Sequence, residues 1–227
     1  MLAGLAMAAC GVAGSAAAQV SASASVASDY RLRGVSLSDL RPAASVSLSD
    51  DLANGIYFGG SALGQDTKQE GAQALGHVEY LGYAGRLAGG AAWDVGVSHQ
   101  RYSLYSAGPS RLSYSEAYVG LSKGALSTRL SYSPDYNGQH HNVAYLEVNG
   151  TVRPAPDWRV AAHLGVFRAL NRWPFVTLRP RYDTRLDVVR RLGPVELDVG
   201  WAAATSGFRA EPKRARGGLV VGLTAYF

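Results

Sequence analysis

The sequence predicts an all-β protein that crosses a membrane as an antiparallel, up-and-down β-barrel of about 12 strands, within a range of about 10 to 14. Three observations lead to this prediction. Apolar and polar residues alternate in segments of about ten residues, the length of a membrane-spanning strand. Longer polar connections alternate with shorter turns along the chain. No apolar segment after residue 18 is long enough to form a transmembrane helix.

The N-terminal segment has the composition of a secretory signal peptide. Residues 1–18 carry no charged side chain and end in three alanines before Gln19, and signal peptidases require small residues next to the cleaved bond. We therefore expect cleavage after Ala18 and a barrel formed by residues 19–227. A transmembrane anchor is the alternative, but the segment is rich in Ala and Gly and barely reaches the roughly 20 residues that span a bilayer.

The single cysteine, Cys10, lies within this N-terminal segment. A lipoprotein would be cut before Cys10 and acylated on it, but Met7-Ala8-Ala9 matches a lipobox poorly and the apolar run before it is short. Without the signal peptide the chain has no thiol. We therefore expect no disulfide, no zinc-thiolate site and no cysteine nucleophile.

The charge of the chain does not indicate a nucleic-acid-binding protein. The net charge is +5 and the pI is about 9.4, but the basic residues are spread along the sequence, with one tight cluster in residues 213–216. A nucleic-acid-binding domain would concentrate them on one patch. Only 17% of the residues are charged, whereas 27 are Gly and 13 are Tyr, a balance that suits a lipid-facing barrel.

The expected strands have one apolar and one polar face. In residues 20–33, apolar side chains alternate with Ser, Asp and Arg, as in a strand with lipid on one side and a polar lumen on the other. The other expected strands are residues 43–49, 56–64, 73–83, 91–102, 112–121, 126–132, 143–150, 158–166, 176–189, 195–203 and 218–227.

The connections between these strands alternate in length. The longer ones are residues 34–42, 65–72, 103–111, 133–142, 168–174 and 205–217, and the shorter turns are residues 50–55, 84–90, 122–124, 151–157 and 192–194. An even-stranded barrel with both chain ends at the periplasmic side would produce this alternation.

A soluble β-sandwich is the main structural alternative, because it also has short alternating strands. The strand lengths and the aromatic residues near strand ends favour a barrel with interfacial girdles. These aromatic residues are Tyr30, Tyr57, Tyr83, Tyr102, Tyr105, Tyr132, Trp158, Trp201 and Tyr226.

Residues 27–36, Ala-Ser-Asp-Tyr-Arg-Leu-Arg-Gly-Val-Ser, resemble the opening strand of the TorF-type putative porins. This proteobacterial outer-membrane family carries an S-D-Y-x-x-R-G-[IV]-S pattern there, matched here by Ser28, Asp29, Tyr30, Arg33, Gly34, Val35 and Ser36. The chain ends in Tyr226-Phe227, which looks like the terminal aromatic signal read by the barrel-assembly machinery. The resemblance implies an outer-membrane location and a barrel architecture more firmly than it implies a transport function.

Charged residues on the polar strand faces are the candidate functional residues. In a barrel these faces point into the lumen, where charges of both signs either pair and fill the interior or line an aqueous path that selects ions. The candidates are Asp29, Arg31, Arg33, Arg129, Arg159, Arg179, Arg181, Asp183, Arg185 and Asp187. If the arginines set selectivity, we expect a modest anion preference that charge reversal of Arg31 and Arg33 weakens.

Other motifs favour turns and loops over catalysis or metal binding. Residues 120–124 match G-x-S-x-G around Ser122, but a strand and not a helix is expected to follow, which favours a hairpin turn over a nucleophile elbow. His140 and His141, near Asp135, lack a third metal ligand at a fixed spacing, so a solvated loop is favoured. Asn149-Gly150-Thr151 fits a glycosylation sequon, but a turn explains it better in a bacterial protein. We expect no enzyme activity, no metal and no cofactor.

The sequence therefore predicts an outer-membrane, porin-like channel for passive diffusion of small hydrophilic solutes or ions. A closed structural or adhesion barrel with extracellular working loops is the alternative, and an outer-membrane hydrolase is a more distant one. The expected partners are outer-membrane lipids and lipopolysaccharide, the barrel-assembly machinery and small solutes, with a monomer favoured and no nucleic acid.

Overall fold

The computed structural model describes residues 19–68, 70–104, 110–138, 140–171, 179–205 and 212–227. The expected signal peptide, residues 1–18, lies outside the described residues, as does Tyr105. Among the helices of the described residues, none is long and apolar enough to cross a membrane.

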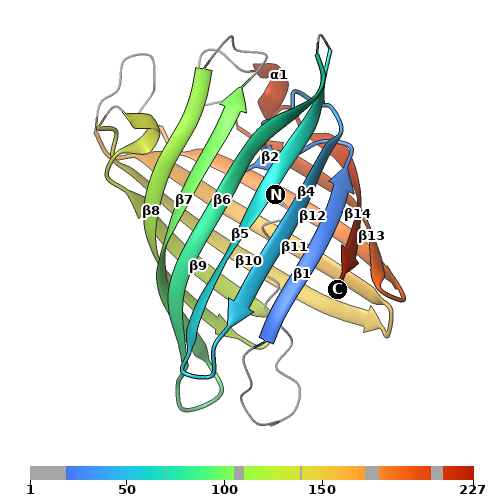
Figure 1. Ribbon diagram of the computed structural model, residues 1–227. Coiled ribbons are helices and arrows are strands. Elements are labelled where there is room, and N and C mark those ends of the chain that lie inside the picture. Colours follow the sequence, from blue (N-terminus) through green and yellow to red (C-terminus); the bar gives the residue numbers. More distant parts are fainter. Residues whose placement is uncertain (1–18, 69, 105–109, 139, 172–178, 206–211) are drawn as a thin grey trace.

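The strands form a closed antiparallel barrel (Figure 1), which confirms the predicted fold class and excludes the β-sandwich. Its twelve strands are β1 (Gln19–Ala27), β4 (Ala43–Asp51), β5 (Ile56–Thr67), β6 (Gly71–Arg86), β7 (Ala92–Leu104), β8 (Ser110–Lys123), β9 (Leu126–Ser133), β10 (Val143–Ala155), β11 (Trp158–Ala169), β12 (Arg181–Leu192), β13 (Val195–Ala204) and β14 (Gly218–Tyr226). Successive strands pair with each other, and β1 pairs with β14 to close the sheet. Closure removes the exposed edge strands that would otherwise promote aggregation.

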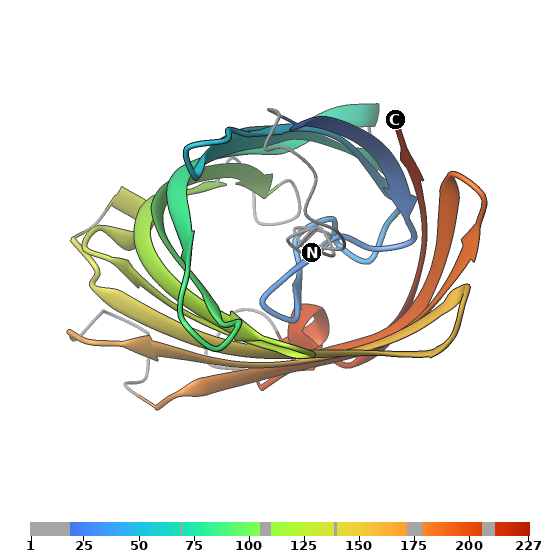
Figure 2. The same cartoon turned by 90° about the horizontal axis from the view of Figure 1, so that it is seen from below.

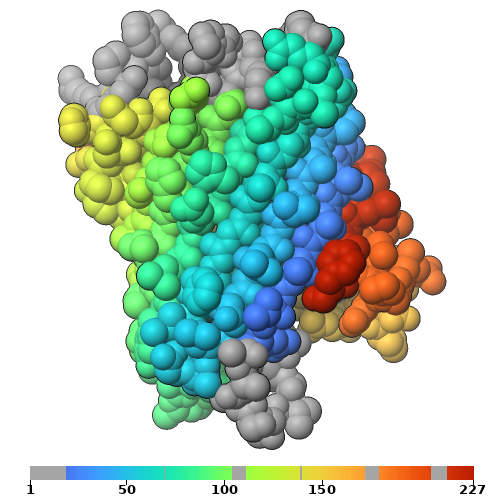
Figure 3. All heavy atoms as spheres, viewed as in Figure 1, coloured from blue at the N-terminus to red at the C-terminus, as the bar shows by residue number. Residues whose placement is uncertain are grey.

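The two faces of the wall differ in polarity as the alternation predicts. On β1 and β4, Ser25 and Ser45 are cross-strand partners whose hydroxyls hydrogen-bond at 2.7 Å. Val46 and Leu48 alternate with these serines and are each 58% exposed on the outside. Large apolar side chains are exposed on other strands too, including Val97, Leu130, Leu164, Leu186, Trp201 and Leu219. The outer wall of β1 and β4 to β6 is continuous in a space-filling view (Figure 3).

The two ends of the barrel differ in their connections. The end that carries Gln19 and Phe227, here called the terminal rim, has the short turns at residues 52–55, 87–91, 124–125, 156–157 and 193–194. The opposite end, here called the loop rim, has the connections 28–42, 68–70, 105–109, 134–142, 170–180 and 205–217. The expected longer loop at residues 65–72 is wrong, because β5 and β6 extend to Thr67 and Gly71 and leave only residues 68–70 between them.

The segment from Ser28 to Pro42 turns into the barrel and does not extend β1, so the expected strand 20–33 is wrong beyond Ala27. Within the segment, β2 (Arg31–Leu32) pairs with β3 (Val35–Ser36) in a separate two-stranded sheet. This inward hairpin lies inside the ring of strands when the barrel is viewed along its axis (Figure 2). The strand prediction failed here because the residues of a short inner hairpin are also extended, and their side chains alternate like those of a wall strand.

The turn of the inward hairpin depends on a glycine. Gly34 has φ +73, and a Cβ on it would lie 2.4 Å from the carbonyl oxygen of Ala203 and 2.8 Å from Cβ of Asp183. Both the backbone conformation and the close approach to the wall therefore require glycine at this position.

Candidate functional site: the barrel lumen

Asp29 organises the inward hairpin. Its Oδ2 accepts a hydrogen bond from Nε of Arg31 at 2.6 Å, and its Oδ1 accepts from the hydroxyls of Ser36 at 2.6 Å and Ser38 at 3.0 Å. All four residues are buried. A buried carboxylate needs such partners to offset the loss of hydration, so the polar residues of the sequence motif hold the hairpin in one shape.

Arg31 joins the hairpin to the barrel wall. Its Nη1 donates to the carbonyl of Ala202 in β13 at 3.1 Å and to the carbonyl of Arg216, just before β14, at 2.9 Å. The same nitrogen donates to the carbonyl of Gly34 at 3.2 Å. One guanidinium therefore bridges the hairpin turn and two wall segments.

Arg33 crosses the lumen to the opposite wall. Its Nη2 lies 2.7 Å from both carboxylate oxygens of Glu116 in β8, and its Cζ lies 4.0 Å above the ring of Tyr145 in β10. Both charged groups are buried. Burial alone would lower the pKa of the Arg33 guanidinium, but the Glu116 carboxylate and nearby tyrosines hold this pKa well above its ordinary value. The Arg33 guanidinium therefore stays charged.

Apolar and aromatic side chains fill the space between the hairpin and the wall near the loop rim. The rings of Tyr114 and Tyr136 lie 4.4 Å apart, and Tyr136 packs edge-on against Phe167. This buried cluster consists of Leu32, Leu37, Leu63, Leu75, Tyr102, Tyr114, Tyr136, Val143, Tyr145, Phe167 and Ala169. The short helix α1 (Pro212–Ala215) also lies inside the ring (Figure 2), where Arg214 is within 3.7 Å of Asp39. The lumen near the loop rim is therefore a packed core.

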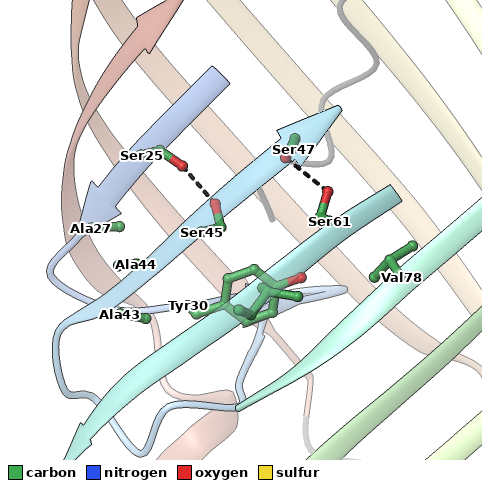
Figure 4. A pocket seen from close by; sticks show the side chains of 10 residues that line it. Ser25, Ala27, Tyr30, Ala43, Ala44, Ser45, Ser47, Ser61 and Val78 are labelled. Carbon is green, nitrogen blue, oxygen red and sulfur yellow. Dashed lines mark hydrogen bonds between the residues drawn. The ribbon is translucent and has the colours of Figure 1, made fainter. Parts of the chain in front are cut away.

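The hairpin also packs closely against β1, β4 and β5. Tyr30 lies over a cavity of about 30 Å³ that Ser25, Ser45 and Ser61 line (Figure 4). Such a volume holds about one or two water molecules. The contact between the hairpin and this part of the wall therefore leaves no solute-sized passage at Tyr30.

The lumen nearer the terminal rim carries charged pairs between strands that are separated by one intervening strand. Asp94 on β7 accepts from Arg129 on β9 at 2.7 Å and from the hydroxyl of Tyr57 at 2.9 Å. Arg159 on β11 pairs with Glu196 on β13 at 2.7 Å. Arg129, Arg159 and Glu196 are partly exposed to the lumen, in contrast to the buried pair of Arg33 and Glu116.

A second group of pairs continues around the lumen on β11 to β13. Arg185 binds Asp187 at 2.7 Å and Asp198 at 2.9 Å. Asp183 accepts from the hydroxyl of Tyr145 at 3.0 Å and lies 2.9 Å from Nε2 of His163. Paired charges of this kind cancel one another over short distances, so the arrangement is an ion-pair network and not a ring of one sign.

The structure places most of the lumen candidates in this network. Arg129, Arg159, Asp183, Arg185 and Asp187 lie on wall strands, whereas Asp29, Arg31 and Arg33 lie on the inward hairpin. Arg181 is buried with its Cζ 4.7 Å from the ring of Phe167. Arg179 precedes β12 and is exposed, so the expectation that it shares the lumen face is wrong.

Sequence reasoning missed the acidic partners Asp94, Glu116, Glu196 and Asp198. Each lies on the inner face of a predicted strand, so the alternation marks their orientation but not their partners. Arg33 and Glu116 are 83 residues apart, and only the register of the barrel and the inward fold of the hairpin bring them together.

The remaining motifs lie in turns, loops and strand ends. Ser122 is near the end of β8, and the β8–β9 hairpin turn follows at Gly124. Asp135 accepts a hydrogen bond from the backbone of His140 and so shapes its loop. Asn149 lies within β10, not in a turn as expected, and its Oδ1 is 2.7 Å from Nδ1 of His163.

The chain ends at the terminal rim. The hydroxyl of Tyr226 donates to Glu196 at 3.4 Å inside the barrel, and Phe227 is 80% exposed. The arrangement is compatible with the predicted assembly signal, which stays a prediction.

A closed barrel with an apolar exterior and a polar, ion-paired lumen belongs to the outer-membrane porin class of folds. The sequence matches the model of a family described as a bacterial protein of unknown function (Gcw_chp) over residues 12–174, and the chain belongs to this family. This family does not carry the TorF name, so the resemblance to the TorF-type porins stays a prediction. No curated protein matches the sequence.

Solved structures to which the chain is similar include porins and channels. The NanC porin is 12% identical with a TM-score of 0.58, over 92% of this chain and 99% of that chain. At this identity the likeness to the NanC porin shows the fold alone. The outer membrane channel DcaP of Acinetobacter baumannii is 10% identical with a TM-score of 0.44, over 93% of this chain and 97% of that chain. An anion-selective porin from Comamonas acidovorans is 9% identical with a TM-score of 0.37, over 93% of this chain and 98% of that chain.

Proposed function

We propose that the protein is an outer-membrane, porin-like channel that passes small hydrophilic solutes or ions by passive diffusion. The observation that carries the proposal is the division of the wall into an apolar outside and a lumen lined by charged and hydroxyl side chains. A water-filled interior accounts for polar lumen residues in a membrane-spanning barrel. Residues 1–18 would direct export, and the terminal rim would face the periplasm.

The inward hairpin is the element that sets the width of the proposed path. Its two strands form a sheet of their own, so the ladder hydrogen bonds of the wall do not hold it. The hairpin is instead held by side-chain contacts, above all Arg33 with Glu116 and Arg31 with backbone carbonyls. We infer that solutes pass only when the hairpin shifts from its seat against the wall.

The pairing of lumen charges argues against the expected anion preference. Arg31 is paired with Asp29 and Arg33 with Glu116, so neither guanidinium presents an uncompensated charge to a passing ion. Reversing the charge of either arginine would therefore disturb the hairpin and not simply change selectivity.

Single-channel recording tests the proposal. The folded protein in a planar bilayer should show small openings, and Glu116→Ala should enlarge them because it removes the carboxylate that holds Arg33. Asp66→Ala is the matched control, since it breaks the exposed pair with Arg41 at the loop rim and leaves the contacts of Arg31 and Arg33 intact. Equal conductance of wild type and Glu116→Ala would contradict the role of the hairpin.

A closed structural barrel is the second candidate, favoured by the packed aromatic cluster near the loop rim. It predicts no current and no solute flux into liposomes from protein shown to be folded. The partners proposed for either function are outer-membrane lipids with lipopolysaccharide and the barrel-assembly machinery, and the protein would act as a monomer.

A further inference from the structure

The outer wall of β6, β7 and β8 carries a group of polar residues on adjacent strands. Glu79, His99 and Ser115 are direct cross-strand partners on three adjacent strands, and we call them the outer row. Each lies two positions from an outward-facing residue of its own strand, Leu81, Val97 or Ala117, and therefore also points away from the lumen. These strands face the viewer in Figure 1.

Two side chains of the outer row contact each other as a nucleophile and a base would. Nδ1 of His99 lies 3.0 Å from Oγ of Ser115, within the range in which an imidazole accepts the hydroxyl proton of a serine. Glu79, on the neighbouring strand β6, has a side chain that is 69% exposed, and its carboxylate lies 3.9 Å from Nε2 of His77. The site is therefore built on the contact between His99 and Ser115.

A second row lies next to the first, further toward the loop rim. Its members, His77, Arg101 and Ser113, are again direct cross-strand partners on the same three strands. Arg101 is exposed, and so is Arg111, which lies nearer the loop rim at the start of β8. Guanidinium groups attract anionic lipid headgroups.

The position of the outer row on the wall indicates its substrate. On β7, outward-facing Trp93, Val95 and Val97 precede His99. At about 3.3 Å per residue and a strand tilt of about 40°, His99 lies roughly 15 Å above Trp93 along the barrel axis. If Trp93 marks the lower edge of an apolar band about 25 Å tall, His99 lies in the outer half of that band. Charged residues on a lipid-facing wall cost free energy, so their presence there calls for a function.

We propose that the outer row is a hydrolase site for acyl esters of anionic lipids in the outer leaflet. Ser115 Oγ attacks the ester carbonyl carbon while its proton passes to Nδ1 of His99, and the carbonyl electron pair moves onto oxygen. The intermediate collapses, the bond to the alcohol breaks, and the alcohol takes the proton from His99. His99 then deprotonates water, the hydroxide adds to the acyl carbon bound to Ser115, and the fatty acid leaves as Oγ of Ser115 takes the proton back from His99.

This proposal relies on the proposed membrane location but not on the proposed channel. Ser115 and His99 are the catalytic residues. Both side chains lie on the outer face of the wall, away from the inward hairpin and the lumen network, so loss of hydrolysis and loss of conductance are separate results.

Release of fatty acid from diacyl phosphatidylglycerol in mixed detergent micelles tests the site. We expect wild type to hydrolyse this lipid faster than diacyl phosphatidylcholine, and Ser115→Ala and His99→Gln to lower the rate by at least about 10³-fold. Ser113→Ala is the matched control, because this serine shares the outer face but lies one row away.

Two further readouts keep the test independent of folding. Heat-dependent migration in gels shows that each variant forms the barrel, and a fluorophosphonate probe followed by mass spectrometry locates the reactive serine. Labelling at Ser115 that His99→Gln abolishes would support the proposal. No hydrolysis by folded wild type, hydrolysis that survives Ser115→Ala, or equal rates on both lipids would overturn it.

Discussion

Arg33 and Glu116 form a buried ion pair across the lumen, from the turn of the inward hairpin to the inner face of β8. The pair is 83 residues apart in sequence. Each charge compensates the desolvation of the other, so removing one partner leaves an uncompensated buried charge.

Breaking this pair should destabilise the protein far more than breaking an exposed pair. We expect Glu116→Ala to lower the free energy of unfolding by about 3–5 kcal/mol, because it leaves Arg33 buried without its carboxylate. Asp66→Ala removes an exposed pair and should change the free energy of unfolding by less than about 1 kcal/mol. Urea unfolding followed by tryptophan fluorescence measures both, and similar losses in the two variants would contradict the importance of the buried pair.

A side chain at Gly34 should prevent the hairpin from seating. Gly34→Ala adds a Cβ that would overlap the backbone of Ala203 and also forces a positive φ on alanine. We expect a loss of about 2–5 kcal/mol from these two effects together. Gly124→Ala is the control, since Gly124 has φ +59 but nothing within 4 Å of its Cβ position, and it should lose about 1–2 kcal/mol. An equal loss in the two variants, measured by urea unfolding, would show that the close approach at Gly34 is unimportant.

Ion selectivity should depend on the balance within the lumen pairs. Arg185→Gln leaves Asp187 and Asp198 without their cation, so the reversal potential in a KCl gradient should move toward that of K⁺. Arg190→Gln serves as the control, because Arg190 faces outward with its Cζ 5.0 Å from the Trp158 ring. A shift toward Cl⁻, or an equal shift in the control, would count against the network as the source of selectivity.

The sequence alone predicted the wall of the barrel in some detail. Alternation in segments such as residues 126–132 and 195–203 agrees with β9 (Leu126–Ser133) and β13 (Val195–Ala204). The reason is physical, because lipid outside and polar groups inside impose opposite polarities on successive side chains. Strand number follows from counting such segments, and the closed sheet follows from the need to pair every edge in a membrane.

Alternation could not show where residues 28–42 go. Asp29, Arg31 and Arg33 have the spacing of a wall strand, yet they form a hairpin inside the barrel because Gly34 permits a tight turn and Asp29 gathers the polar side chains around it. The sequence marks these residues as a motif but does not reveal their partners.

The sequence by itself determined the class of fold, the positions of most wall strands and which of their side chains face inward or outward, since each of these depends on local periodicity. Only the tertiary structure decided which charges pair. It also decided that the inward hairpin occupies the lumen and that Glu79, His99 and Ser115 meet on the outer wall. Cross-strand register and barrel closure bring together residues that are distant in sequence, and no local pattern encodes that register.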